Sequence, residues 1–131
     1  RWGYRLIPMI SLPLAGLLLL VAVGVAAPYA AVLALMATFF MVELNEGPFW
    51  ATTMRVARSD TGAATGVLNT GGNFAGMVSA PIIGALSGAG HWNATFVIGA
   101  AFAFVAAACW FAIDPDRRVV TDRGESSAAA A

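Results

Sequence analysis

Two long stretches without a charged residue constrain this sequence more than any other feature. No Asp, Glu, Lys or Arg occurs in the 37 residues from Leu6 to Val42 or in the 53 residues from Thr61 to Ile113. A helix of a soluble protein needs an outward polar face, which stretches of this length without charges do not supply. Only 11% of all residues are charged, whereas soluble domains average about 25%. The sequence therefore predicts an all-α membrane protein.

Turn residues divide these stretches, because a helix needs only about 20 apolar residues to cross the hydrocarbon core. Reversals are expected in VGVAAPY at 23–29 and in SGAGHWN at 87–93, where Gly, Pro and Asn gather. The polar segment MRVARSDTG at 54–62 separates the two stretches. We predict a transmembrane region over residues 1–114, followed by a disordered cytoplasmic tail over 115–131 that is low in apolar bulk. Its four spans are expected at about 4–25, 28–56, 61–86 and 92–113.

The positively charged residues all fall on one side of these predicted spans. They precede the first span, lie between the second and third, or follow the fourth: Arg1, Arg5, Arg55, Arg58, Arg117, Arg118 and Arg123. Positive residues are retained in cytoplasmic loops. We therefore expect a multi-pass protein of the plasma (inner) membrane, with both ends of the chain in the cytoplasm.

Composition also excludes several classes of partner and site. The formal net charge is zero and no basic patch occurs away from the ends, so nucleic acid is not an expected partner. The single cysteine, Cys109, lies in an apolar stretch and is expected to pack there, without a disulfide or metal framework. No cofactor is expected. The chain starts at Arg1 rather than Met, and we expect an upstream part to be missing.

The segment ELNEGPFW at 43–50 places two carboxyl groups inside the second predicted span. Their spacing of three predicts that Glu43 and Glu46 share one face of a helix. A charge at the bilayer centre costs about 3 kcal/mol, so such residues usually mark a substrate or proton path. The alternative is that they pair with other helices and only hold the bundle together. In a transporter, we expect at least one of them to carry a proton during part of the cycle.

The same segment contains a helix-breaking pair, Gly47 and Pro48. Pro48 lacks a backbone donor and crowds the carbonyl of Leu44. Freed backbone at membrane depth is tolerated where it is buried in protein or lines water, which favours a cavity wall or hinge here, although proline can also serve packing alone. Trp50 lies too deep to be an interfacial anchor and is expected either to stack on a ligand or to fill the core.

The third predicted span, with GVLNTGGNFAGMVSAPIIG at 66–84, separates small and polar residues from bulky apolar ones. At 100° per residue, Asn69 and Asn73 share a face with several glycines. Small residues permit close helix packing, while the two amides need partners that lipid cannot supply, either on other helices or on a substrate. The first and fourth spans have no comparable group and are expected to face lipid or to support the middle pair.

The segments GPFWA at 47–51 and NTGGN at 69–73, with the short arginine-containing turn between them, resemble the closing part of the anion:cation symporter family. This family belongs to the major facilitator superfamily, and the resemblance covers about residues 1–118. It implies that the four spans are the last four of twelve and that the two middle ones line a central cavity. It also implies that Trp50 and Asn69 contact the substrate. Glu43 and Glu46 are not part of the family pattern.

The leading hypothesis is a C-terminal fragment of a symporter for a small organic anion, such as a sugar acid or an aromatic acid, working by alternating access. Its expected partners are the anion, a proton or sodium ion for coupling, the lipid bilayer, and the missing N-terminal helices of the same transporter. The hypothesis assigns substrate contact to five residues and a hinge to two more: Trp50, Asn69, Asn73, Glu46 and Glu43, and Gly47 and Pro48.

Two other classes fit part of the pattern. One is a complete four-span, proton-coupled exporter that works as a dimer, and the other is a membrane scaffold subunit whose polar groups only bond between helices. An enzyme using Glu43 and Glu46 as an acid and base pair lacks an accompanying nucleophile, metal cluster or phosphate loop, and no enzyme activity is expected. The substrate, the coupling ion and the direction of transport stay open at this point.

Overall fold

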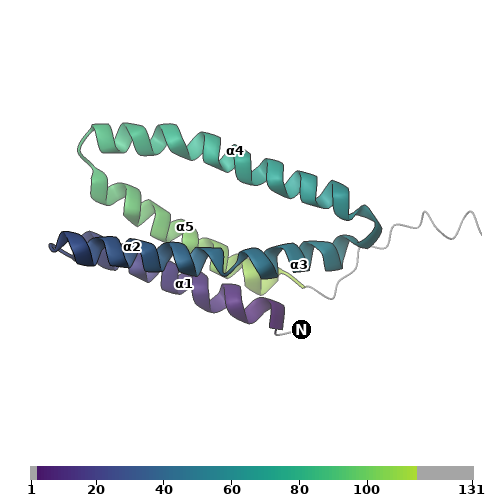
Figure 1. The fold of residues 1–131 in the computed structure, drawn as a ribbon. Coiled ribbons are helices and arrows are strands. Elements are labelled where there is room, and N and C mark those ends of the chain that lie inside the picture. The colour runs from purple at the N-terminus through teal and green to yellow at the C-terminus, as the bar shows by residue number, and fades with distance from the viewer. Residues whose placement is uncertain (1–2, 115–131) are drawn as a thin grey trace, which may run out of the picture.

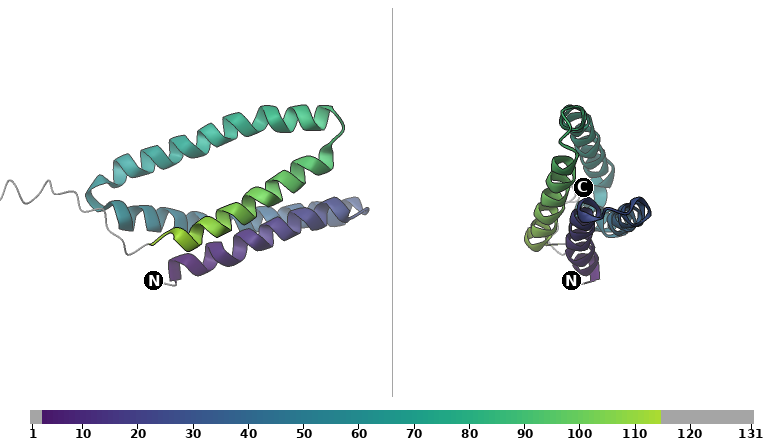
Figure 2. Two further views of the ribbon diagram at one scale, coloured as in Figure 1. Left: turned by 180° about the vertical axis from the view of Figure 1, so that it is seen from behind. Right: turned by 90° about the vertical axis from the view of Figure 1, so that its left-hand side faces the viewer.

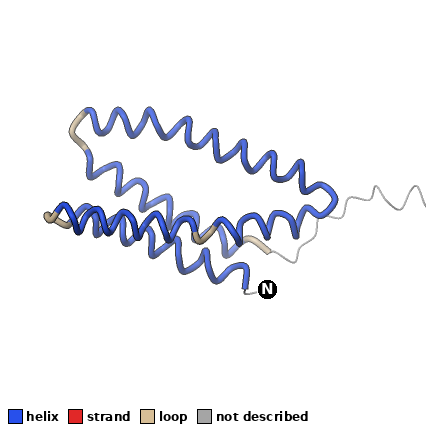
Figure 3. Tube along the Cα trace, viewed as in Figure 1, coloured by secondary structure: helices blue, strands red, loops and turns tan. Residues whose placement is uncertain are grey.

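The computed structural model describes residues 3–114, and this part of the chain is built from helices joined by short turns (Figures 1 and 3). In chain order they are α1 (Gly3–Gly24), α2 (Pro28–Glu43), α3 (Glu46–Ala57), the short 3-10 helix η1 (Arg58–Asp60), α4 (Thr61–Gly88) and α5 (Trp92–Ala112). No strand occurs within residues 3–114, which confirms the all-α prediction for this range. The predicted tail at 115–131 lies outside the described residues.

Within residues 3–114, three helical stretches are long and apolar enough to cross a membrane: Tyr4–Gly24, Pro28–Gly88 and Trp92–Ala112. The middle one has 61 residues and would measure about 90 Å if straight, three times the hydrocarbon thickness. Instead the chain reverses at η1, so that α4 runs back in the direction opposite to that of α2 and α3 (Figure 1). The division of this stretch into two spans, and so the total of four, stays a prediction.

A turn at Leu44 and Asn45 separates α2 from α3 (Figure 3). Pro48 has no N–H to donate to the Leu44 carbonyl, which is four residues earlier. The Asn45 N–H bonds to the Val42 carbonyl, only three residues earlier, at 3.0 Å, and regular bonding resumes from the Phe49 N–H to the Asn45 carbonyl at 3.0 Å. The helix therefore breaks at Leu44, whose carbonyl has no N–H donor because residue 48 is a proline.

Asn45 supplies side-chain bonds at this break. Its Nδ2 donates to the carbonyls of Met41 at 2.9 Å and Val42 at 3.1 Å, and its Oδ1 accepts from the Ser11 hydroxyl at 3.0 Å. Ser11 is a buried residue of α1. Polar backbone groups within an apolar span must be hydrogen-bonded by protein groups. Asn45 bonds to the backbone carbonyls at the break and also links the break to α1 through Ser11.

The closest helix packing lies between α1 and α5. Ala15 and Ala100 are almost fully buried, and a Cβ at Gly16 would lie 3.2 Å from the Phe104 ring and 3.3 Å from the Ala100 carbonyl oxygen. Small residues let two helix backbones approach this closely. The end-on view in Figure 2 shows α1 between α5 and α2. The first and last helices thus form the core of the described chain, with many of their other apolar side chains exposed.

In contrast, α4 stands apart from the other helices over most of its length (Figures 1 and 2). None of its residues is buried. A Cβ added at Gly66, Gly72 or Gly76 would meet no described atom within 4 Å. Close packing across the small-residue face of α4 is therefore not formed within residues 3–114, and it stays a prediction.

The reversal at η1 gives a direct test of topology. Ser59 lies in η1, and Ala89 follows the last residue of α4 at the opposite end of that helix. In protein lacking Cys109, single cysteines replacing Ser59 and Ala89 should react with an impermeant maleimide from opposite sides of the membrane, with Ser59 on the cytoplasmic side. Labelling of both positions from the same side would disprove a membrane crossing by α4.

Candidate functional site

A recess between α3 and α4 brings together three of the polar side chains that the sequence places within the membrane. We call it the polar recess. Its volume is about 140 Å³, and it is lined by Glu46, Phe49 and Trp50 of α3 and by Leu68, Asn69 and Gly72 of α4. Three predicted site residues, Glu46, Trp50 and Asn69, thus come together from two antiparallel helices.

Glu46 and Trp50 are joined by a hydrogen bond. The indole Nε1–H of Trp50 donates to Oε2 of Glu46 at 2.7 Å. The two residues are four apart in α3, so their side chains share one face of the helix. Because this bond uses the only donor of the indole, Trp50 has only its ring left to contact a ligand. This pair was not among the predictions from the sequence, although the spacing of four was a signal for it.

Glu43 lies apart from this arrangement. It is the last residue of α2, whereas Glu46 is the first residue of α3, and the turn at Leu44 and Asn45 separates them. The regular helical rotation that predicted a shared face does not continue through this turn. Glu43 is exposed and does not line the polar recess. Its contact with substrate, like the protonation of both carboxyl groups, stays a prediction.

Of the two amides on α4, only Asn69 lines the polar recess. Asn73 lies one turn further along, and its Nδ2 donates to the Asn69 backbone carbonyl at 2.9 Å. Gly72 leaves space beside Asn69 because it has no side chain. Gly47 and Pro48 follow Glu46 in the first turn of α3, so the predicted hinge adjoins the recess without lining it.

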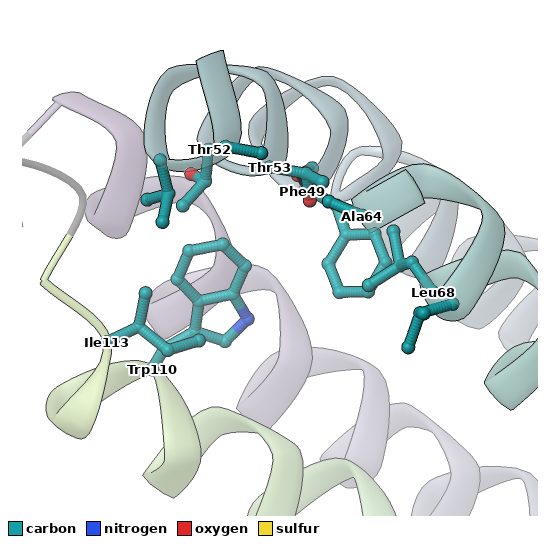
Figure 4. Close-up of a pocket in the computed structure, with 10 residues that line it drawn as sticks. Phe49, Thr52, Thr53, Ala64, Leu68, Trp110 and Ile113 are labelled. Carbon is teal, nitrogen blue, oxygen red and sulfur yellow. Dashed lines mark hydrogen bonds between the residues drawn. The ribbon is translucent and has the colours of Figure 1, made fainter. Parts of the chain in front are cut away.

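A larger cavity of about 460 Å³ lies beside the polar recess, between α3, α4 and the end of α5. Figure 4 shows Trp110 of α5 and Phe49 of α3 pointing into it, with ring centroids 6.5 Å apart. Apolar side chains form most of its wall, and the Oγ1 atom of Thr52 is buried there without a hydrogen-bond partner among residues 3–114. Since the carboxyl and amide groups line the smaller recess, that recess is the better candidate for contact with the polar part of a ligand.

The charges around the polar recess are unevenly distributed. Among the described residues 3–114, Glu46 is the only ionisable one in the lining. The described arginines lie elsewhere: Arg5 at the start of α1, Arg58 in η1, and Arg55 near the end of α3, where its guanidinium stands 5.5 Å from the ring centre of Tyr4. Residues 3–114 contain no group of three or more His, Cys, Asp and Glu side chains that could hold a metal ion.

Comparison with known proteins gives two matches. The family model described as the Major Facilitator Superfamily matches residues 1–130. The probable sulfoacetate transporter SauU of Cupriavidus necator is 35% identical over 86 residues, which make up 65% of this chain and 20% of that relative. The matched segment is thus only a fifth of the relative's length. No solved structure matches the chain.

Proposed function

Because the chain belongs to the major facilitator superfamily, we propose that it forms the C-terminal part of a symporter for a small organic anion. The family and the apolar helices indicate a multi-pass membrane protein that takes part in transport. The relative named as a sulfoacetate transporter supports an organic anion as the substrate, since sulfoacetate is itself a small organic anion. Transport would proceed by alternating access around a site near the membrane midplane, driven by a proton or sodium ion.

The observation that carries this proposal is the meeting of Trp50 and Asn69 in the polar recess. The resemblance to organic-anion symporters assigns substrate contact to the same two residues. The Asn69 side chain offers two N–H donors for substrate oxygen atoms, while the Trp50 ring can pack on the carbon skeleton. Asn73 and Glu43 would contact the substrate only from positions beyond this recess.

The arrangement of the helices supports the same reading. The polar recess lies between α3 and α4, whereas α1 and α5 pack against each other through small apolar residues. We therefore assign α3 and α4 to the transport path and α1 and α5 to a supporting role. A recess of about 140 Å³ is smaller than typical ligand pockets of about 300–1,000 Å³, so it would hold one part of the substrate.

Uptake by the full-length protein in proteoliposomes tests the proposal. Sulfoacetate, gluconate and 4-hydroxybenzoate represent sulfonates, sugar acids and aromatic acids. At least one of them should accumulate, and an inward proton or sodium gradient should increase its initial rate, with empty liposomes as the control. Proton-driven transport of an organic cation, with no uptake of any anion, would support the exporter alternative. Failure to move either class would contradict a transport function.

A further inference from the structure

The polar recess combines a carboxyl group with a substrate that we propose to be an anion. Glu46 lines the recess, and no arginine or histidine of residues 3–114 does so. A substrate carboxylate or sulfonate placed against ionised Glu46 would be repelled, and repulsion is stronger in a protein interior than in water. The negatively charged group of the substrate is therefore not expected to lie against Glu46.

Glu46 nevertheless has unused capacity to accept hydrogen bonds. Its Oε2 accepts the Trp50 indole N–H, while its Oε1 accepts no hydrogen bond from any residue in the described range 3–114. An ionised carboxyl group has about four acceptor positions. An N–H or O–H group of a ligand that enters the recess beside Glu46 can thus donate a hydrogen bond to these positions.

Asn69 lines the recess together with Glu46 and complements this chemistry. Its amide has both donor and acceptor atoms, so it can bond to a hydroxyl group in either direction. The recess volume of about 140 Å³ corresponds to roughly five water molecules at about 30 Å³ each. Such a space suits a hydroxyl-bearing end of a molecule, whose remaining part, with its charged group, would extend out of the recess.

We propose that Glu46 selects hydroxylated organic anions, by accepting a hydrogen bond from a substrate hydroxyl group while it holds the Trp50 ring in place. This inference rests on the proposed function and adds the orientation and class of the substrate. A hydrogen bond to a charged acceptor, once lost, leaves that acceptor unsatisfied. The full-length protein should therefore bind a hydroxylated anion about 10- to 100-fold more tightly than the same anion without the hydroxyl group.

The test compares matched anions by equilibrium binding to the full-length protein. Three pairs cover the three substrate classes: 3-sulfolactate with 3-sulfopropanoate, 4-hydroxybenzoate with benzoate, and gluconate with hexanoate. In the pair that binds, wild-type protein should prefer the hydroxylated member. Glu46→Leu should bring the ratio of the two affinities close to one, and Glu46→Gln should lower it, since the neutral amide oxygen is a weaker acceptor.

Two further variants separate this role from a structural one. Asp60→Asn should keep the hydroxyl preference, because Asp60 lies in η1 and does not line the polar recess. Trp50→Phe removes the indole N–H but leaves the Glu46 carboxylate, so it should also keep the preference even if overall affinity falls. If Glu46→Leu does not yield folded protein, the affinity ratio in Glu46→Gln decides.

The outcomes distinguish the inference from the proposed function. Equal affinity of wild type for both members of a pair, or a hydroxyl preference that persists in every folded Glu46 variant, would overturn the inference while organic-anion transport stands. Transport of sulfoacetate, together with equal affinity for 3-sulfolactate and 3-sulfopropanoate, would also overturn the inference and leave the proposed function standing. Lack of binding by every anion would reject the proposed function and this inference with it.

Discussion

Replacing Trp50 by alanine in the full-length protein should weaken substrate binding about 30-fold or more, which corresponds to about 2 kcal/mol. The half-buried indole lines the polar recess, and its bond to Glu46 fixes the ring. Alanine would remove the proposed contact surface and also leave Glu46 without its partner. Calorimetry on purified protein would measure the change in Kd. Membrane abundance should change little, because Trp50 lies outside the packing of α1 on α5.

Asn69→Ala extends the same prediction to the opposite wall of the recess. Loss of the amide should weaken binding by about 1–3 kcal/mol. Asn73→Ala should have a smaller effect, because Asn73 does not line the recess and its Nδ2 bonds within its own helix.

Matched controls for these two substitutions are available on α5. Trp92, at the start of α5, is 60% exposed, and Asn93 follows it. Neither residue lines the polar recess, so Trp92→Ala and Asn93→Ala should leave Kd unchanged. If Trp50→Ala and Asn69→Ala instead lower the yield of folded protein while the remaining protein binds normally, the recess serves packing and the scaffold alternative gains support.

The second large effect is expected at Gly16, where leucine should destabilise the packing of α1 on α5. Even a Cβ at this position would lie 3.2 Å from the Phe104 ring and 3.3 Å from the Ala100 carbonyl oxygen. A leucine side chain can be accommodated only if the helices separate, and overpacking of this kind costs about 1–3 kcal/mol or more. Gly16→Leu should therefore lower the apparent Tm in detergent and the yield of monodisperse protein.

Gly24→Leu provides the matched control for Gly16→Leu. Gly24 ends the same helix, and a Cβ there would meet no described atom within 4 Å. The same increase in side-chain volume should be tolerated at this position. Equal thermal stability of the two leucine variants would show that α1 and α5 do not approach closely in the membrane.

The parts of the fold that sequence predicted correctly follow from local rules. Stretches without charges exclude a water-facing surface, which is sufficient to predict apolar helices. Because Pro48 lacks an N–H, the residue that loses its donor, Leu44, can be named in advance, and the turn occurs there. The superfamily assignment based on GPFWA and NTGGN is confirmed by the family match over residues 1–130.

Features that depend on contact between distant segments were not predictable in this way. The first and fourth spans were expected only to support the middle pair or to face lipid, yet they form the closest packing in the described chain through Gly16 and Ala100. Hydrophobicity does not specify which apolar helices pair, since all of them are similarly apolar. The role of Asn45 depends in part on Ser11, which is 34 residues away. The separation of Glu43 from the polar recess follows from the turn, which a continuous helical projection ignores.

The turn at Leu44 and Asn45 has a mechanical consequence for the polar recess. The Leu44 carbonyl accepts no bond from residue 48, because Pro48 has no N–H. A tilt of α3 about this point would therefore break no regular helical bond there. The bond between Ser11 and Asn45 holds the turn against α1, so such a tilt would move α3 rather than α2. Glu46 and Trp50 both belong to α3 and would travel together with their hydrogen bond intact. Asn69 belongs to α4. A rocking motion would therefore change the width of the recess and leave the bond between Glu46 and Trp50 intact.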